Sequence, residues 1–284
     1  MRSAVEVPFS LPRRRSGQAA LWLAIAWTAL LAAAALAASW LPLRSPIDGD
    51  LTAVLAHPGG AYWLGTDSLG RDLLARCIFG ARVSLMVALG SIAIGALVGG
   101  SLGLVAGFFG GLLDRLAMDL MTVLLCFPAL ILAIAIIASL GPSLATVTLA
   151  IGVLFIPAFA RVARANTLTF RQQEFVLAAE VMGARAGRIL IREILPNILP
   201  SLLSLALVLV GVAILAEASL GFLGLSVTPP TPSWGGMIAT ERGSLTQAPH
   251  VVFVPALFLF LTVLAMNVIG ERIRRMFDIK NQAV

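Results

Sequence analysis

Long apolar stretches with few or no charges recur along the chain, and shorter polar segments separate them. A helix needs about 20 apolar residues to cross a bilayer core roughly 30 Å thick. Six stretches approach this length, and they cover residues 19–41, 83–109, 120–140, 144–160, 198–225 and 251–269. The pattern predicts an all-α, polytopic membrane protein with six transmembrane helices.

The composition supports this prediction, because 59% of the residues are hydrophobic and only 12% are charged. Soluble domains are far less apolar. The net charge of +6 does not indicate a nucleic-acid partner, since the basic residues are scattered between apolar stretches instead of forming one polar face. The expected partner of this surface is a lipid bilayer.

The basic residues also predict an orientation. Most of the 20 lysines and arginines precede the first stretch, lie in the segment 161–197 or follow residue 271. Segments rich in Lys and Arg stay in the cytoplasm, so we expect both termini on the cytoplasmic side of the membrane. The predicted divisions are a cytoplasmic segment 1–18, a first helix 19–41, an external loop 42–82, a core 83–271 with five helices and a cytoplasmic loop 161–197, and a cytoplasmic tail 272–284.

The first stretch could instead belong to a signal peptide. The apolar region of a signal peptide has about 7 to 15 residues, and the uncharged stretch 19–41 is longer. We therefore expect it to remain as a membrane anchor.

Glycines recur at every fourth position in the second stretch, at residues 95, 99, 103, 107 and 111. Small residues on one side of a membrane helix let another helix approach closely. The same segment places Ser101 in a formal Gly-x-Ser-x-Gly match, a pattern that in serine hydrolases requires a strand-to-helix turn. Helix packing is the favoured interpretation of these glycines.

The chain lacks the residues for nucleotide hydrolysis. A P-loop needs a lysine directly after its glycines, and the single lysine, Lys280, follows Asp278 and Ile279. Two cysteines and two histidines show no metal-ligand spacing. We expect a subunit without catalytic activity, cofactor or metal.

One acidic residue, Glu217, falls within the fifth apolar stretch. Ionisable groups inside a membrane are costly and often functional, but they also fasten helices together through hydrogen bonds. The sequence leaves both a pathway role and a packing role open.

The cytoplasmic segment contains Phe-Val-Leu-Ala-Ala-Glu-Val-Met-Gly at 175–183 and Glu-Ile-Leu-Pro at 193–196. This resembles the EAA loop of ABC importer permeases, and it departs from that pattern at Leu177 and Glu193. The segments 64–76, 160–164, 220–225 and 229–235 resemble one branch of the family, the second (C-type) permease subunits of peptide and nickel importers.

The resemblance implies a type I ABC importer bundle and a set of partners: a homologous permease subunit, two ATPase subunits and an external substrate-binding protein. It also implies that a helix in this loop contacts an ATPase subunit, with Ala178 and Ala179 letting it seat deeply and Phe175, Val176 and Met182 supplying apolar contact. The expected coupling residues are Glu174, Phe175, Ala178, Ala179, Met182, Gly183, Leu195 and Pro196.

The expected cargo is a dipeptide or oligopeptide. Two alternatives remain: nickel or another small solute carried by the same family, and an ion-coupled secondary transporter. The secondary transporter would need a relay of ionisable residues inside the membrane, whereas the stretches contain one clear acid.

Overall fold

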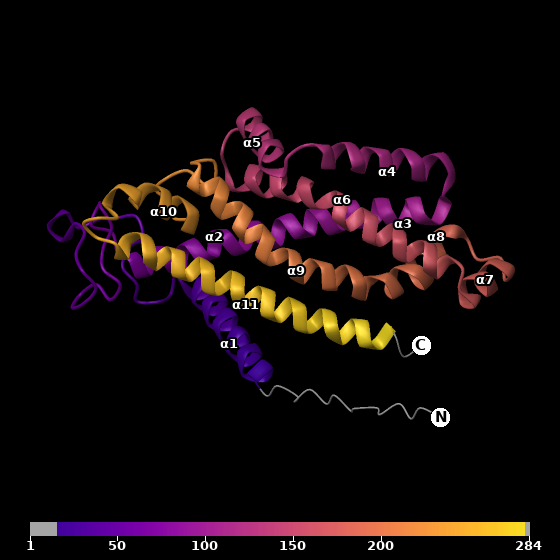
Figure 1. Ribbon diagram of the computed structural model, residues 1–284, viewed down its shortest axis with the longest axis horizontal. Coiled ribbons are helices and arrows are strands. Elements are labelled where there is room, and N and C mark those ends of the chain that lie inside the picture. The colour runs from indigo at the N-terminus through magenta and orange to yellow at the C-terminus, as the bar shows by residue number, and fades with distance from the viewer. Residues whose placement is uncertain (1–15, 282–284) are drawn as a thin grey trace, which may run out of the picture.

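The structure is a computed structural model that describes the backbone of residues 16–281 and the side chains of residues 18–274. Most of the N-terminal segment 1–18 and the last residues of the expected tail 272–284 lie outside this part of the chain. Long helices lie alongside one another, and no strand occurs among the described residues (Figure 1). The α-helices are α1 (Ser16–Ala37), α2 (Leu73–Ile94), α3 (Gly100–Phe109), α4 (Gly111–Cys126), α5 (Ala129–Leu140), α6 (Leu144–Arg171), α7 (Glu174–Val181), α8 (Ala186–Arg188), α9 (Leu195–Phe222), α10 (Trp234–Glu241) and α11 (His250–Asn281).

Five helical spans in the described chain are long and apolar enough to cross a membrane, and they include α1, α6 and α11. The other two are continuous through π-helical turns: α2 leads into α3 through Gly95–Gly99, and α8 leads into α9 through Ile189–Ile194. The sixth candidate is the pair α4 and α5, which meet at an angle of 91°. At 1.5 Å per residue the two helices are about 24 and 18 Å long, so neither crosses a 30 Å core alone. Together they return the chain from the end of α3 to the start of α6 (Figure 1).

The bend between α4 and α5 lies inside the expected third helix, 120–140. Phe127 is extended, with φ −82° and ψ 133°, and Pro128 follows it. Proline pushes the preceding residue away from helical geometry and has no N–H to donate. The prediction of one uninterrupted helix was therefore wrong at this point.

The first two helices also differ from the expected bounds. α1 ends at Ala37, before residue 41, and α2 begins at Leu73, inside the expected loop 42–82. A carboxylate oxygen of Asp72 accepts hydrogen bonds from the backbone N–H groups of Leu74 (2.8 Å) and Ala75 (3.2 Å). This side chain caps the helix and fixes its start.

The fourth helix is longer than the expected 144–160, because α6 continues to Arg171. Arg164 lies on α6 and pairs with Asp114 in the first turn of α4, with 2.6 Å between its Nη2 and Oδ2. The arginines that suggested a loop at 161–171 are thus helical residues. The segment 161–197 contains only a short non-helical part on either side of α7.

The glycine ladder packs α2 and α3 against α6, as predicted. A Cβ on Gly99 would meet the carbonyl oxygen of Ile156, and a Cβ on Gly103 would meet that of Ala160. Gly111 lies outside this contact, with a positive φ of 64° and open space around it. Ser101 is the second residue of α3, inside the continuous helical span Leu73–Phe109, and its hydroxyl donates to the carbonyl oxygen of Leu97 at 2.5 Å. The geometry of a nucleophile elbow is absent there.

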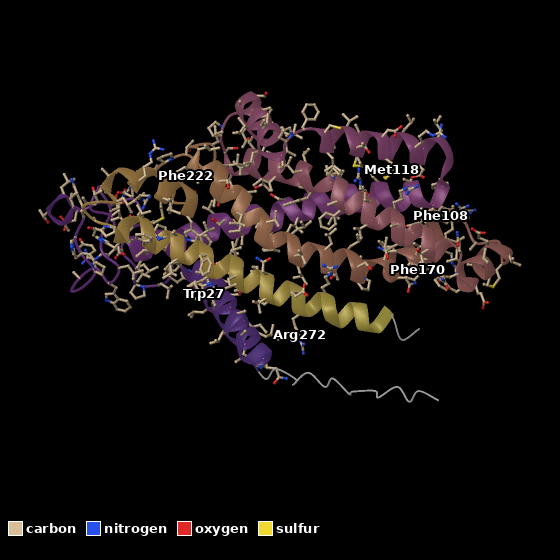
Figure 2. The ribbon with its side chains drawn as sticks, viewed as in Figure 1. Trp27, Phe108, Met118, Phe170, Phe222 and Arg272 are labelled. Carbon is tan, nitrogen blue, oxygen red and sulfur yellow. The ribbon has the colours of Figure 1, made fainter. Side chains whose placement is uncertain are left out.

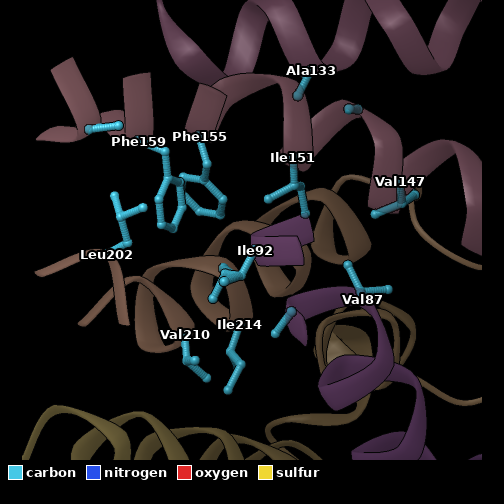
Figure 3. Close-up of a cluster of buried hydrophobic side chains, with 14 of the residues drawn as sticks. Val87, Ile92, Ala133, Val147, Ile151, Phe155, Phe159, Leu202, Val210 and Ile214 are labelled. Carbon is cyan, nitrogen blue, oxygen red and sulfur yellow. The ribbon is translucent and has the colours of Figure 1, made fainter. Parts of the chain in front are cut away.

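The main core lies where α2, α5, α6 and α9 meet (Figure 3). It contains Val87, Ile92, Ala133, Val147, Ile151, Phe155, Phe159, Leu202, Val210 and Ile214, all buried. α1 packs against α11 at the side of the bundle, where the indole of Trp27 donates to the hydroxyl of Thr262 at 3.1 Å (Figure 2). Trp27 also stacks edge-on against Phe258, with ring centroids 5.6 Å apart.

One end of the bundle carries a cap, which we define as residues 42–72 together with α10. It lies opposite the end that carries α7, and the last turns of α11 point toward the α7 end (Figure 1). The cap is fastened to α2 by Trp234, whose indole N–H donates to the carbonyl oxygen of Cys77 at 3.0 Å.

Candidate functional site

The expected coupling residues gather around α7, a helix of eight residues that projects beyond the long helices at one end of the bundle (Figure 1). α7 follows α6 after two residues and precedes the π-helical start of the α9 span. Its position therefore ties it to the ends of two membrane-crossing helices.

The two faces of α7 differ in burial. Val176 is fully buried and Ala179 is 7% exposed, and both belong to the main core. Val181 is 89% exposed and Met182 is 81% exposed, and Phe175 and Leu177 are also exposed. Apolar side chains gathered on a protruding helix indicate a surface that another protein covers.

Two expectations for this helix need correction. Val176 was expected to contact a partner, and Ala179 was expected to let the helix seat in it. Both side chains instead anchor α7 to its own bundle. Ala178 remains exposed, as do Glu174 in the first turn and Phe175 beside it.

The end of α7 forms a Schellman motif. Gly183 has φ 79°, its N–H donates to the carbonyl oxygen of Glu180 at 2.9 Å, and the N–H of Ala184 donates to that of Ala179 at 3.0 Å. Glycine adopts this left-handed conformation without the steric cost of a Cβ. The sequence prediction for Gly183 is confirmed.

The α7 end also contains a pocket between α3 and the loop that follows α7. Arg171 lies over the ring of Phe108, 5.5 Å from its centroid, and Phe108 packs edge-on against Phe109. The pocket is lined by Phe108, Phe109, Arg171, Glu180, Ala184, Ala186 and Ile189.

Leu195 and Pro196 are the first two residues of α9, and the π-helical turn before them makes them part of the continuous helical span Ala186–Phe222. Leu195 is half-buried and Pro196 is exposed. Pro196 has no N–H to donate to the carbonyl of Arg192. The π-helical turn Ile189–Ile194 lies directly before this position.

Glu217 lies far along α9 from α7 and is fully buried. Its two carboxylate oxygens accept hydrogen bonds from the hydroxyls of Ser84 on α2 and Ser226 after α9, each at 2.7 Å. This arrangement fastens α9 to α2 and to the loop that leads into the cap. The structure thus places Glu217 in a packing contact, and nothing in the sequence pattern indicated the two serines.

The cap holds a buried ionic cluster that sequence reasoning did not resolve. Asp67 is 1% exposed, and its Oδ2 lies 2.6 Å from Nε of Arg71 and 3.3 Å from Nε of Arg76. Its Oδ1 accepts from the backbone N–H groups of Leu69 and Arg71, both at 2.9 Å. Buried charges need such partners, so the cluster fixes the loop before α2.

A second carboxylate in the cap is exposed. Hydrogen bonds from Thr52 hold the pKa of Asp50 below its usual value, and the hydroxyl of Tyr62 donates to its other oxygen at 3.2 Å. Asp50 caps the short 3₁₀ helix Leu51–Ala53.

These features define a class of protein: a multi-pass helical membrane protein with a structured cap at one end of the bundle and an exposed apolar helix at the other. Residues 99–281 match the family described as the binding-protein-dependent transport system inner membrane component. The chain belongs to this family. It is a non-catalytic inner-membrane permease subunit of an ABC importer, a system that also uses ATPase subunits and a substrate-binding protein.

The chain is 41% identical over 247 residues to the glutathione transport system permease protein GsiD of Pectobacterium atrosepticum, which covers 86% of this chain and 82% of that protein. It is also 41% identical over 255 residues to GsiD of Escherichia coli O1:K1, covering 88% of this chain and 83% of that protein. Its fold is similar to that of a chain of the MetNI methionine ABC transporter in an inward-facing conformation, with a TM-score of 0.58 and 20% identity. That match covers 71% of this chain and 95% of the MetNI chain.

Proposed function

We propose that this subunit carries peptide-type solutes across the inner membrane and that α7 is the helix through which an ATPase subunit moves it. The observation that carries the proposal is the exposed apolar face of α7, with Val181 and Met182 almost fully accessible. A helix that presents apolar side chains at the end of a bundle fits a groove on another protein.

The charge distribution supports a cytoplasmic position for this end. Arg171, Arg185, Arg188 and Arg192 lie around α7, and all four are exposed. Basic segments between membrane helices are retained in the cytoplasm. The cap then faces the opposite side, where a substrate-binding protein would dock.

The core contacts of α7 explain how force would travel. Val176 and Ala179 fix its inner face to the bundle, so a displacement of α7 moves its anchorage as well. The α9 span begins at Ala186 and continues to Phe222. Packed helices shift between discrete arrangements as rigid bodies, so a push at α7 would reach the region of Glu217.

The proposed cargo is a peptide-type solute, and the relatives named as glutathione permeases support this class because glutathione is a tripeptide. We propose a heterodimer with a homologous permease subunit, two cytoplasmic ATPase subunits and an external binding protein. Nickel uptake by the same complex would overturn the cargo assignment.

The test of coupling is Val181→Glu in the assembled complex reconstituted in vesicles. We expect it to abolish substrate-stimulated ATP hydrolysis while the subunit still inserts into the membrane, because a charge on the exposed apolar face blocks docking. Gln172→Glu is the matched control, since it adds the same charge to an exposed polar residue two positions before α7. Normal stimulation in Val181→Glu would refute the coupling role.

A further inference from the structure

A polar stripe runs along α4, although the helix belongs to the apolar pair α4–α5. Its members are Arg115, Asp119, Thr122 and Cys126, and all four are exposed. Spacings of four, three and four residues place them on one face of the helix. A face with two charges and a hydroxyl is poorly suited to contact lipid.

A matching exposed stripe runs along α6 through Arg161, Ala165 and Thr169, at intervals of four residues. The two stripes meet where Nη2 of Arg161 donates to the hydroxyl of Thr122 at 3.3 Å. Thr122 lies eight residues after Asp114, so this contact is about 12 Å along α4 from its first turn. Arg161 itself belongs to the candidate membrane span Leu144–Arg171, ten residues before its end.

Arg161 differs from its neighbour Arg164 in its partners. Arg164 pairs with Asp114 through two of its nitrogens. Among the described residues, no carboxylate lies within ion-pair distance of Arg161, and Thr122 is the partner recorded for its side chain. A guanidinium within a membrane span that has no acid beside it marks a water-filled path or a ligand site.

We infer that the face formed by the stripes of α4 and α6 lines the aqueous path of the solute, and that Arg161 binds the carboxylate of that solute as it passes. A guanidinium presents a planar fork that pairs with a carboxylate through two hydrogen bonds. The identity of the solute as a peptide-type acid rests on the proposed function. The Asp119 carboxylate lies one turn away on the same face, where it complements the ammonium group of such a zwitterion.

The two cysteines of the chain allow a direct test, because Cys126 is exposed on the polar stripe and Cys77 is buried. The assembled complex in vesicles is treated with an anionic and with a cationic methanethiosulfonate reagent of similar size. We expect both to modify Cys126, and we expect Arg161→Gln to lower the anionic-to-cationic rate ratio about twofold to tenfold, because the attraction of one nearby charge is lost. The variant Cys126→Ser shows which part of the labelling comes from Cys126. Arg115→Gln is the control, because it removes an equal charge about three helical turns from Cys126 along α4.

Two outcomes of this experiment overturn the inference. If charged reagents leave Cys126 unmodified while an apolar maleimide reacts with it, the face contacts lipid. If the rate ratio is the same in Arg161→Gln as in the wild type, the guanidinium is neutralised by an acid of a neighbouring subunit and is not available to the solute.

Transport provides the second measurement. Uptake is compared for a peptide with a free C-terminal carboxylate and for the same peptide with a C-terminal amide, both chosen for measured affinity to the binding protein. Arg161→Gln is expected to reduce uptake of the free acid at least about tenfold more than uptake of the amide. Equal reduction of both would refute the carboxylate site. A wild-type complex without ATP-dependent peptide uptake would refute the proposed function instead, and the labelling result would still stand by itself.

Discussion

The hydroxyl of Ser84 donates a hydrogen bond to a carboxylate oxygen of Glu217 at 2.7 Å, although 133 positions separate the two residues along the chain. Ser226 donates to the other oxygen at the same distance. The carboxylate therefore joins α2, α9 and the loop before α10 at a fully buried point. This contact connects two membrane helices to the loop that leads into the cap.

Replacing Glu217 tests this junction. Glu217→Gln keeps one acceptor oxygen and is expected to destabilise the subunit by about 1 kcal/mol, whereas Glu217→Leu leaves two buried hydroxyls without an acceptor and is expected to cost about 2–4 kcal/mol. Thermal unfolding of the detergent-solubilised complex shows whether Glu217→Leu is less stable than Glu217→Gln, as expected. Adding Ser84→Ala to Glu217→Leu is expected to restore part of the loss, and no restoration would contradict the assigned hydrogen bond.

The ladder glycines predict a second pair of variants. A Cβ on Gly103 would collide with the backbone of Ala160, whereas a Cβ on Gly100 would lie 3.6 Å from the end of the flexible Leu202 side chain. We expect Gly103→Ala to destabilise the α3–α6 contact by about 1–3 kcal/mol through overpacking. Gly100→Ala on the same helix is the control, and equal unfolding temperatures for the two variants would show that the close approach is not required.

The left-handed glycine after α7 predicts an effect on coupling. Gly183→Ala is expected to strain the Schellman motif by about 1–2 kcal/mol, because only glycine adopts this conformation freely. Substrate-stimulated ATP hydrolysis should fall while basal hydrolysis is unchanged. Gly187→Ala is the matched control. Gly187 does not have a positive φ, and a Cβ added there would lie in open space.

The ionic cluster of the cap predicts a larger effect. Asp67→Asn removes the charge shared by Arg71 and Arg76 and is expected to cost about 3–5 kcal/mol, as when one partner of a buried ion pair is lost. Limited proteolysis from the cap side should then cleave the segment before α2 faster. Asp48→Asn, at an exposed position in the same segment, should leave the cleavage rate unchanged.

The sequence predicted the features that depend on local pattern. Hydrophobic length gave the membrane-crossing helices, the spacing of glycines gave the α3–α6 contact, and Gly183 gave the end of α7. Pro128 indicated a possible bend after α4, but the stretch around it is uncharged and was therefore interpreted as one helix.

The errors arose where distant partners decide the environment of a residue. Arg164 was placed in a loop because its charge suggested water, yet it lies on α6, where Asp114 pairs with it. Arg76 was placed in the external loop, yet Asp67 and the cap bury it on α2. A hydropathy pattern predicts that such a charged residue is exposed, because the pattern contains no information about the distant acidic residue that pairs with it.

The π-helical turn Gly95–Gly99 has a consequence for the alignment of the second membrane span. A π turn takes in one residue more than an α turn, so it delays the rotation of every residue that follows. If the same residues formed an α turn instead, α3 would be rotated by about 100° about its axis. Gly103 and Gly107 would then turn away from α6, and larger side chains would face it. The number of residues in this turn, and not only their small size, sets the register between the two helices.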